Sequence, residues 1–111
     1  MPAEFVLVFP DATAAEANRL AVTLADTVRD TDPGVVVERR RERPDTQDFG
    51  ASLAIMLGTA AATAVAKGIS AWLARNSGVR IEIKRKGETV LVATHLDSKD
   101  ISRLASLLSD S

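Results

Sequence analysis

The amino-acid sequence predicts a single α+β domain over residues 1–111, in which helices pack on a mixed four-stranded sheet. Three observations support this fold class. Two short runs of β-forming residues flank an amphipathic helix near the N-terminus. A stretch without any charged residue, 49–66, occupies the middle of the chain. An alternating strand, a turn and a further strand then precede a last amphipathic helix, which gives the order βαβαββα.

The N-terminal third predicts a strand, a helix and a second strand. Residues 5–9 are all apolar β-formers, as in an interior strand that is covered on both faces. Thr13 and Glu16 have the spacing of a capping box, and apolar residues follow at helical spacing up to residue 30. After a turn at 32–34, residues 35–39 form the second strand. Because a long crossover normally joins parallel strands, we expect these two strands to pair in parallel.

The charge-free stretch predicts one long central helix over residues 49–76, with Asp48 as its N-cap. Small residues recur at every fourth position, which is the spacing of one helix face. They are Ala54, Gly58, Ala62, Ala66 and Ser70. Such a stripe lets a neighbouring backbone approach closely. We expect these residues, together with Trp72, to form a close-packing surface, either inside the core or between copies of the chain.

The C-terminal third predicts a hairpin and a helix. Residues 79–84 alternate between apolar and charged, which is typical of a half-buried strand. A turn at 85–88 leads into a fourth strand at 89–94. Ser98 is the expected N-cap of the last helix, which carries buried leucines at helical spacing. The two flanking helices are therefore shorter and amphipathic, and the central helix is long and rich in small residues.

The composition excludes several classes of site. The chain has no cysteine, so disulfides, thiolate nucleophiles and cysteine metal sites are absent. Its net charge is −1, which excludes a polycation that binds nucleic acid or anionic lipid through overall charge. The apolar run near the N-terminus is too short for a signal peptide. We therefore expect a cytoplasmic protein.

Four arginines form the densest run of positive charge: Arg39, Arg40, Arg41 and Arg43. If their strand lies beside the strand at 79–84, they merge with a second basic cluster into a patch that could hold phosphates. Interleaved glutamates, and the lack of a nearby aromatic residue for base stacking, disfavour nucleic acid. The arginines then either protect a sheet edge from aggregation or dock an acidic protein partner.

The candidate catalytic residues are few. His95 is the only histidine, and with Asp97 and Asp100 it could bind a metal weakly or act as a base. These carboxylates, however, lie where they cap the last helix and complement its dipole. The tripeptide at 48–50 matches a kinase metal-binding motif, but no other kinase motif accompanies it. We expect no enzymatic activity, no cofactor and no metal site.

The charge-free stretch also raises the question of a membrane. A transmembrane helix needs about 20 strongly apolar residues. Seven of the 18 residues at 49–66 are alanine, and glycine, serine and threonine dilute the stretch further. A resting membrane span is therefore not expected. The membrane hypothesis that stays open is a stored helix that becomes membrane-active when it is released.

The chain from Asp48 onward is similar to a known family. The small-residue helix ends in Ser70-Ala71-Trp72-Leu73, and an alternating strand, a polar turn, a second strand and a leucine-bearing helix follow. In this order the chain resembles the effector-associated constant component family, small α+β proteins encoded in bacterial conflict systems beside variable effectors such as peptidase-like domains. The family supplies no catalytic residue.

The resemblance implies a non-catalytic accessory domain in antiviral defence. Such a domain couples to or scaffolds an effector protein encoded nearby, and homo-oligomers are one form that the scaffold takes. Two alternatives stay open. One is a phosphate- or nucleic-acid-binding domain that uses the arginine run, and the other is the stored membrane-active helix.

Overall fold

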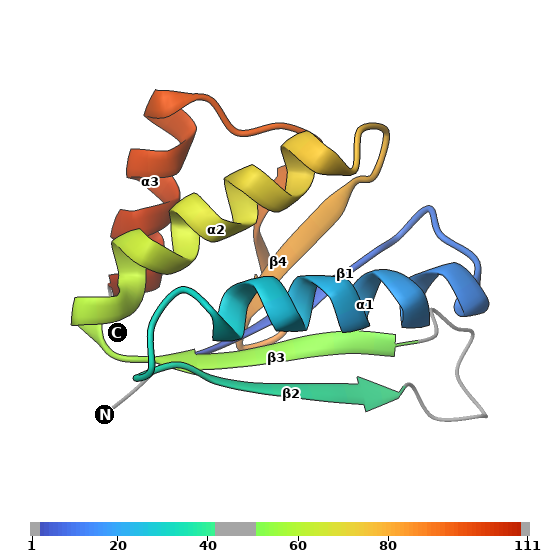
Figure 1. Ribbon diagram of the computed structural model, residues 1–111, viewed down its shortest axis with the longest axis horizontal. Coiled ribbons are helices and arrows are strands. Elements are labelled where there is room, and N and C mark those ends of the chain that lie inside the picture. The colour runs from blue at the N-terminus through green and yellow to red at the C-terminus, as the bar shows by residue number, and fades with distance from the viewer. Residues whose placement is uncertain (1–2, 42–50, 110–111) are drawn as a thin grey trace.

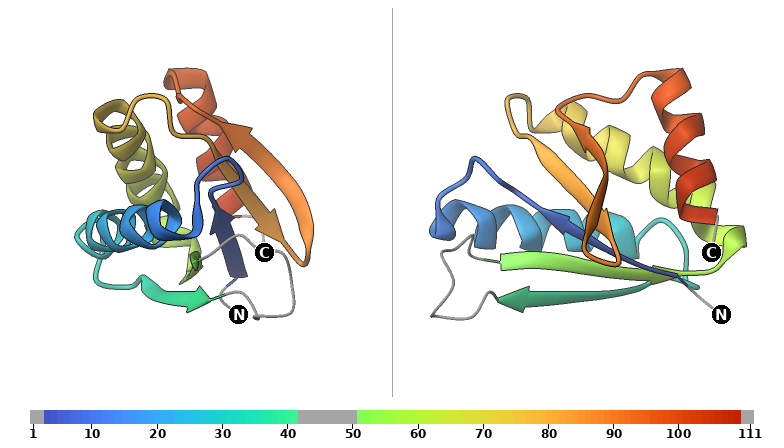
Figure 2. Two further views of the ribbon diagram at one scale, coloured as in Figure 1. Left: turned by 90° about the vertical axis from the view of Figure 1, so that its right-hand side faces the viewer. Right: turned by 180° about the vertical axis from the view of Figure 1, so that it is seen from behind.

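The computed structural model describes residues 3–41 and 51–109. Its elements are β1 (Ala3–Val8), α1 (Ala14–Arg29), β2 (Val36–Arg41), β3 (Ala51–Leu57), the 3-10 helix η1 (Thr59–Ala61), α2 (Ala62–Arg75), β4 (Ile81–Arg85), β5 (Glu88–Ala93) and α3 (Ser98–Ser109). Three α-helices lie on one side of a five-stranded sheet (Figures 1 and 2). The α+β class is confirmed, whereas the expected number of strands is wrong by one.

The order of strands in the sheet is β2-β3-β1-β4-β5, and every neighbouring pair is antiparallel. β1 is an interior strand, as its apolar sequence predicts. The expected parallel pairing of β1 with β2 is wrong, and so is the mixed sheet. The two strands do run in the same direction, but β3 lies between them and pairs antiparallel with both. The additional strand therefore separates the two strands that the crossover was expected to join.

That additional strand comes from the predicted long helix, which is wrong in its first half. Residues 51–57 form β3, and the helix begins only at Ala62. Gly58 separates the two with an extended backbone, at φ −90° and ψ 173°. The helix does end where it was expected, with Asn76 as its C-cap. Asp48, its expected N-cap, lies outside the described residues.

The physical reason for this error is the burial of β3 on both faces. Leu53, Ile55 and Leu57 face the helices in the core, and Ser52 and Ala54 on the opposite face are also buried. A strand covered on both sides has no alternation of apolar and polar residues. Without that alternation, a run of apolar and small residues is equally compatible with a buried helix.

The remaining local signals have mixed outcomes. Thr13 and Glu16 form the predicted capping box of α1, with contacts of 3.2 Å between each side chain and the other residue's amide. The hairpin turn is confirmed, with Lys86 and Gly87 both at positive φ. Ser98 is not the N-cap of α3, because the residue before it takes that position.

The helices and the sheet enclose one hydrophobic core. Trp72 and Phe9 meet in it with ring centroids 6.0 Å apart, and both are almost fully buried. α1 packs against β2 and β3, and α2 lies between α1 and α3. None of these helices covers the opposite face of the sheet, the open face, although Ser52 and Ala54 are buried on it (Figure 2). In the described part of the chain, no helix is long and apolar enough to cross a membrane.

Candidate functional site

His95 and its neighbouring carboxylates are not arranged as a three-residue metal site. Within residues 3–41 and 51–109 there is no group of three histidine or acidic side chains that could hold a metal ion. Asp97 Oδ1 accepts the amide of Asp100 at 2.8 Å, and Asp100 Oδ2 accepts the amide of Asp97 at 3.1 Å. Asp97, not Ser98, is therefore the N-cap of α3. The amide of Asp100 lowers the pKa of Asp97, because it stabilises the charged carboxylate.

The predicted arginine run is divided between the two faces of β2. Arg39 lies opposite Leu53, which faces the helices, and Arg40 lies opposite Ser52 on the open face. Arg41 contributes backbone pairing to β3, and Arg43 lies outside the described residues. The premise of one merged basic patch is wrong, because β3 and β1 separate β2 from β4. The arginines thus divide into separate environments.

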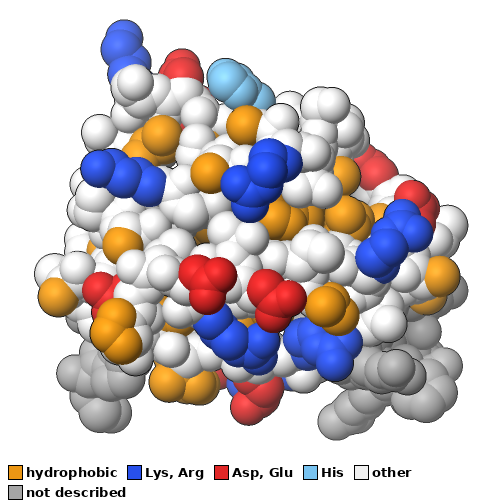
Figure 3. All heavy atoms as spheres, in the orientation of Figure 1, with side chains coloured by type: hydrophobic (Ala, Val, Ile, Leu, Met, Phe, Trp, Pro, Cys, Tyr) orange, Lys and Arg blue, Asp and Glu red, His pale blue; other side chains and the backbone are white. Residues whose placement is uncertain are grey.

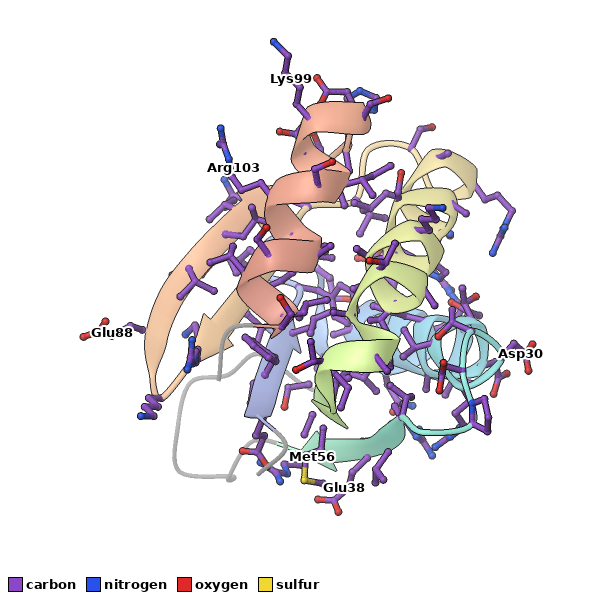
Figure 4. All side chains as sticks on the ribbon, turned by 90° about the vertical axis from the view of Figure 1, so that its left-hand side faces the viewer. Asp30, Glu38, Met56, Glu88, Lys99 and Arg103 are labelled. Atoms are coloured by element: carbon purple, nitrogen blue, oxygen red, sulfur yellow. The ribbon has the colours of Figure 1, made fainter. Side chains whose placement is uncertain are left out.

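Arg40 is held tightly by carboxylates of its own chain. Its guanidinium contacts Glu4 at 2.9 Å and Glu38 at 3.0 Å. These hydrogen bonds, that of Glu4 first, raise the pKa of Arg40. The contact with Glu4 spans β3 and passes the position of Ala54, which is fully buried. Glu38 and Met56 both point away from the helices, which marks this face as the open one (Figure 4).

Arg39 and Arg29 lie on the helix side of β2 and are held by longer contacts. Arg39 Nη1 donates to Asn18 Oδ1 at 3.3 Å, from β2 to α1. Arg29 Nη2 donates to the carbonyl of Val37 at 3.3 Å, and its ion pair with Asp26 measures 3.6 Å. Acidic and basic side chains lie side by side over α1 and β2 (Figure 3). The sequence analysis did not identify Arg29; its position in the last turn of α1, off the apolar face, is the signal for it.

The predicted small-residue stripe does not lie on one helix. Ala54 belongs to β3 and Gly58 to the connection, whereas Ala62 and Ala66 are buried in α2. A Cβ added to Gly58 would meet no atom within 4 Å. Ser70 Oγ donates to the carbonyl of Leu96 at 3.1 Å and so joins α2 to the segment before α3. Only the second half of the stripe therefore keeps helical spacing.

At Gly68, which was not among the predicted packing residues, α2 lies close to the turn that follows α1. A Cβ on Gly68 would lie 2.5 Å from the methyl group of Thr31. Further along α2, Trp72 Nε1 donates to Thr23 Oγ1 at 3.0 Å and Arg75 to Thr27 Oγ1 at 3.4 Å. Threonines spaced four apart thus line α2 from the side of α1. An isolated glycine inside a helical pattern was the available signal.

A small pocket of about 100 Å³ lies near the start of α1. Its walls combine apolar and charged side chains, and the latter include Glu16 and the ion pair of Arg80 with Asp11 at 3.0 Å. Arg80 Nε is buried and has no hydrogen-bond partner within the described residues. The pocket is smaller than the usual ligand site of about 300–1,000 Å³.

Comparison with known proteins supports the resemblance. The family model described as Effector Associated Constant Component 1 matches residues 10–109. Searches of curated proteins and of solved structures gave no match. The family match covers α1 to α3, including the N-terminal half, whose likeness the sequence showed only in its layout. The chain therefore belongs to the Effector Associated Constant Component 1 family.

Proposed function

We propose that this chain is a non-catalytic interaction domain that couples to an effector protein in a bacterial conflict system. The observation that carries the proposal is the family match over residues 10–109, because the name of the family describes its members as associated with effectors. The architecture is compatible with docking. Its sheet has an open face, on which Val36 and Val92 are each about half exposed.

The proposal includes the kind of partner and the setting. The effector is a peptidase-like or similar protein encoded near this chain, and the complex acts in the cytoplasm as part of antiviral defence. Self-association is a second part of the proposal, and the face of the sheet that no helix covers is the surface proposed for it. Nucleic acid is not included, because Arg40 is already neutralised by two carboxylates of its own chain.

Co-expression tests the proposal directly. The chain would be produced together with the effector encoded beside it, and complex formation would be followed by affinity purification and light scattering. We expect a stable complex that survives inactivation of the effector's catalytic residue, because docking does not require turnover. An effector that elutes separately at micromolar concentrations of both proteins would contradict the proposal.

Light scattering of the isolated chain tests the self-association part. We expect the mean mass to rise above 11.8 kDa as the concentration increases. A mass that stays monomeric over the whole accessible range would remove self-association from the proposal. It would leave the coupling to an effector unaffected.

A further inference from the structure

The two edges of the sheet differ in regularity. β2 forms one edge and pairs residue for residue with β3 from Val36 to Arg41. No other strand of the described residues pairs with its outer side, and Figure 2 shows β2 at the border of the sheet. β5 forms the other edge, where the register shifts between Ile83 and Lys84. Such an irregularity twists an edge strand and hinders further pairing. β2 is therefore the edge that can accept another strand.

Two loosely held guanidinium groups lie along this edge. Arg29 of α1 donates to the carbonyl of Val37 in β2 at 3.3 Å, and Arg39 of β2 itself donates to Asn18 of α1 at 3.3 Å. Charge-assisted bonds to carboxylates are shorter, at about 2.7–2.9 Å. An incoming strand could replace Arg29 at Val37 with its own N–H group and offer Arg29 a carboxylate instead. Both exchanges favour an acidic strand.

We propose that β2 binds an extended acidic segment of a protein partner as a sixth strand, with Arg29 and Arg39 receiving its carboxylates. The backbone of the segment provides the main attraction, and alternating acidic side chains on the helix side provide specificity. That the partner is the effector rests on the proposed function. That β2 binds an acidic strand is argued from the edge itself and does not rest on it.

A second copy of the chain fits this edge less well. Two β2 strands that pair antiparallel about Arg39 would place this arginine opposite its own copy, and like charges across a strand pair are destabilising. The carboxylates that pair with Arg40 do not neutralise the positive charge on the helix side, because they lie with Arg40 on the open face. The charge of the edge thus selects against self-pairing and for an acidic partner.

A peptide of defined composition tests the edge without knowledge of the effector. The probe is an acetylated peptide that alternates glutamate with threonine, and its counterpart alternates lysine with threonine. We expect the acidic peptide to slow amide hydrogen exchange in β2 and to leave β5 unaffected. Arg39→Glu should weaken this binding about tenfold. Arg103→Glu, the same charge change on an exposed residue of α3 far from Glu38 of β2, should change it less than about twofold (Figure 4).

Several results would overturn the inference. One is slower amide exchange in β5 and not in β2. Another is an equal loss of affinity for the acidic peptide in Arg39→Glu and Arg103→Glu. The third is a higher affinity for the lysine peptide or for a single-stranded oligonucleotide than for the acidic peptide. The same variants separate this inference from the proposed function. An effector that binds Arg39→Glu as well as the wild-type chain contradicts the edge but supports coupling. An effector that binds neither the wild-type chain nor Arg39→Glu contradicts coupling. The peptide experiment alone then tests whether β2 binds an acidic strand.

Discussion

The segment predicted as one long helix, 49–76, contains two regions of similar composition and different structure. Residues 51–57 form a strand that is buried on both faces, and residues 62–75 form a helix that is buried on one. Both are rich in alanine and in large apolar residues. The difference lies in their neighbours, because β3 has a strand on each side while α2 has helices. Tertiary contacts decide the structure where local sequence is compatible with both.

The largest effect is expected in the helical region. Trp72→Ala should lower the free energy of unfolding by about 3–5 kcal/mol, because a large buried side chain leaves a cavity beside Phe9. Trp72→Phe is the matched control. It keeps an aromatic ring but loses the bond to Thr23, and we expect a smaller loss of about 1–2 kcal/mol.

Urea unfolding followed by circular dichroism measures both variants, because the substitution removes the fluorescent side chain. A Trp72→Ala variant with wild-type stability would be incompatible with burial in the core. It would favour the other position predicted from the sequence, in which Trp72 lies between copies of the chain.

The strand region should respond most strongly at its smallest buried position. Ala54 lies between Glu38 and Val6 on the open face, where Arg40 reaches across β3. Ala54→Leu should cost about 1–3 kcal/mol, because the larger side chain competes with the guanidinium for this space. Met56→Leu, two residues along the same face, should cost less than about 1.5 kcal/mol.

Thermal unfolding compares these two variants. If Ala54→Leu unfolds at the wild-type temperature, there is free space above β3 and the contact of Arg40 with Glu4 does not cover Ala54. If both variants lose the same stability, the position along the face does not matter. Either result would contradict the strand geometry described above.

Gly58, before α2, and Gly68, inside it, provide the most direct comparison. Gly68→Ala should lose about 1 kcal/mol, because the clash with Thr31 outweighs the gain in helix propensity. Gly58→Ala should be neutral within about 0.5 kcal/mol, because its surroundings are open. The Thr31 hydroxyl donates to the carbonyl of Val28 at 2.6 Å, which holds the clashing methyl group in place.

Thr31→Ser removes that methyl group and serves as the control. In its background, Gly68→Ala should become stabilising by up to about 1 kcal/mol, the helix propensity of alanine over glycine. A larger loss for Gly58→Ala than for Gly68→Ala would contradict the assignment of the close contact. It would also restore the original stripe, in which Gly58 was the tight position.

Local signals predicted much of this fold. The capping box of Thr13 with Glu16 located α1, and the positive-φ turn at Lys86 and Gly87 located the hairpin. These features depend on neighbours in sequence, so one chain is enough to recognise them. β3 depends on partners 40 or more residues from it in β1, which no local pattern contains.

The candidate site shows the same limit. The basic character of residues 39–41 was visible in the sequence, but its division between the two faces depends on β3 as a neighbour. Arg29 reaches β2 only because α1 packs across that edge. The family resemblance was found because it rests on the order of segments, which survives an error in one of them.

The smallest effect on stability is expected at Asp97, the N-cap of α3. This residue lies next to the contact that joins α3 to α2. Asp97 directly follows Leu96, whose carbonyl accepts the hydroxyl of Ser70 from α2. The pKa of Asp97 is lowered in the folded chain, so its charge stabilises the fold above its unfolded pKa, near 3.8, and this contribution is lost as the pH falls through the folded pKa. Asp97 is exposed, so the effect is small and salt weakens it.

Two variants separate the charge of Asp97 from its role as a cap. Asparagine is also a good N-cap, so Asp97→Asn should be less stable than the wild type at neutral pH and should converge with it in acid. Asp97→Ala removes the acceptor as well and should be less stable at every pH. Urea unfolding between about pH 7 and about pH 2.5 distinguishes these patterns. A constant difference between Asp97→Asn and the wild type would show that the carboxylate charge contributes nothing, and the amide of Asp100 would then act only as a hydrogen-bond donor.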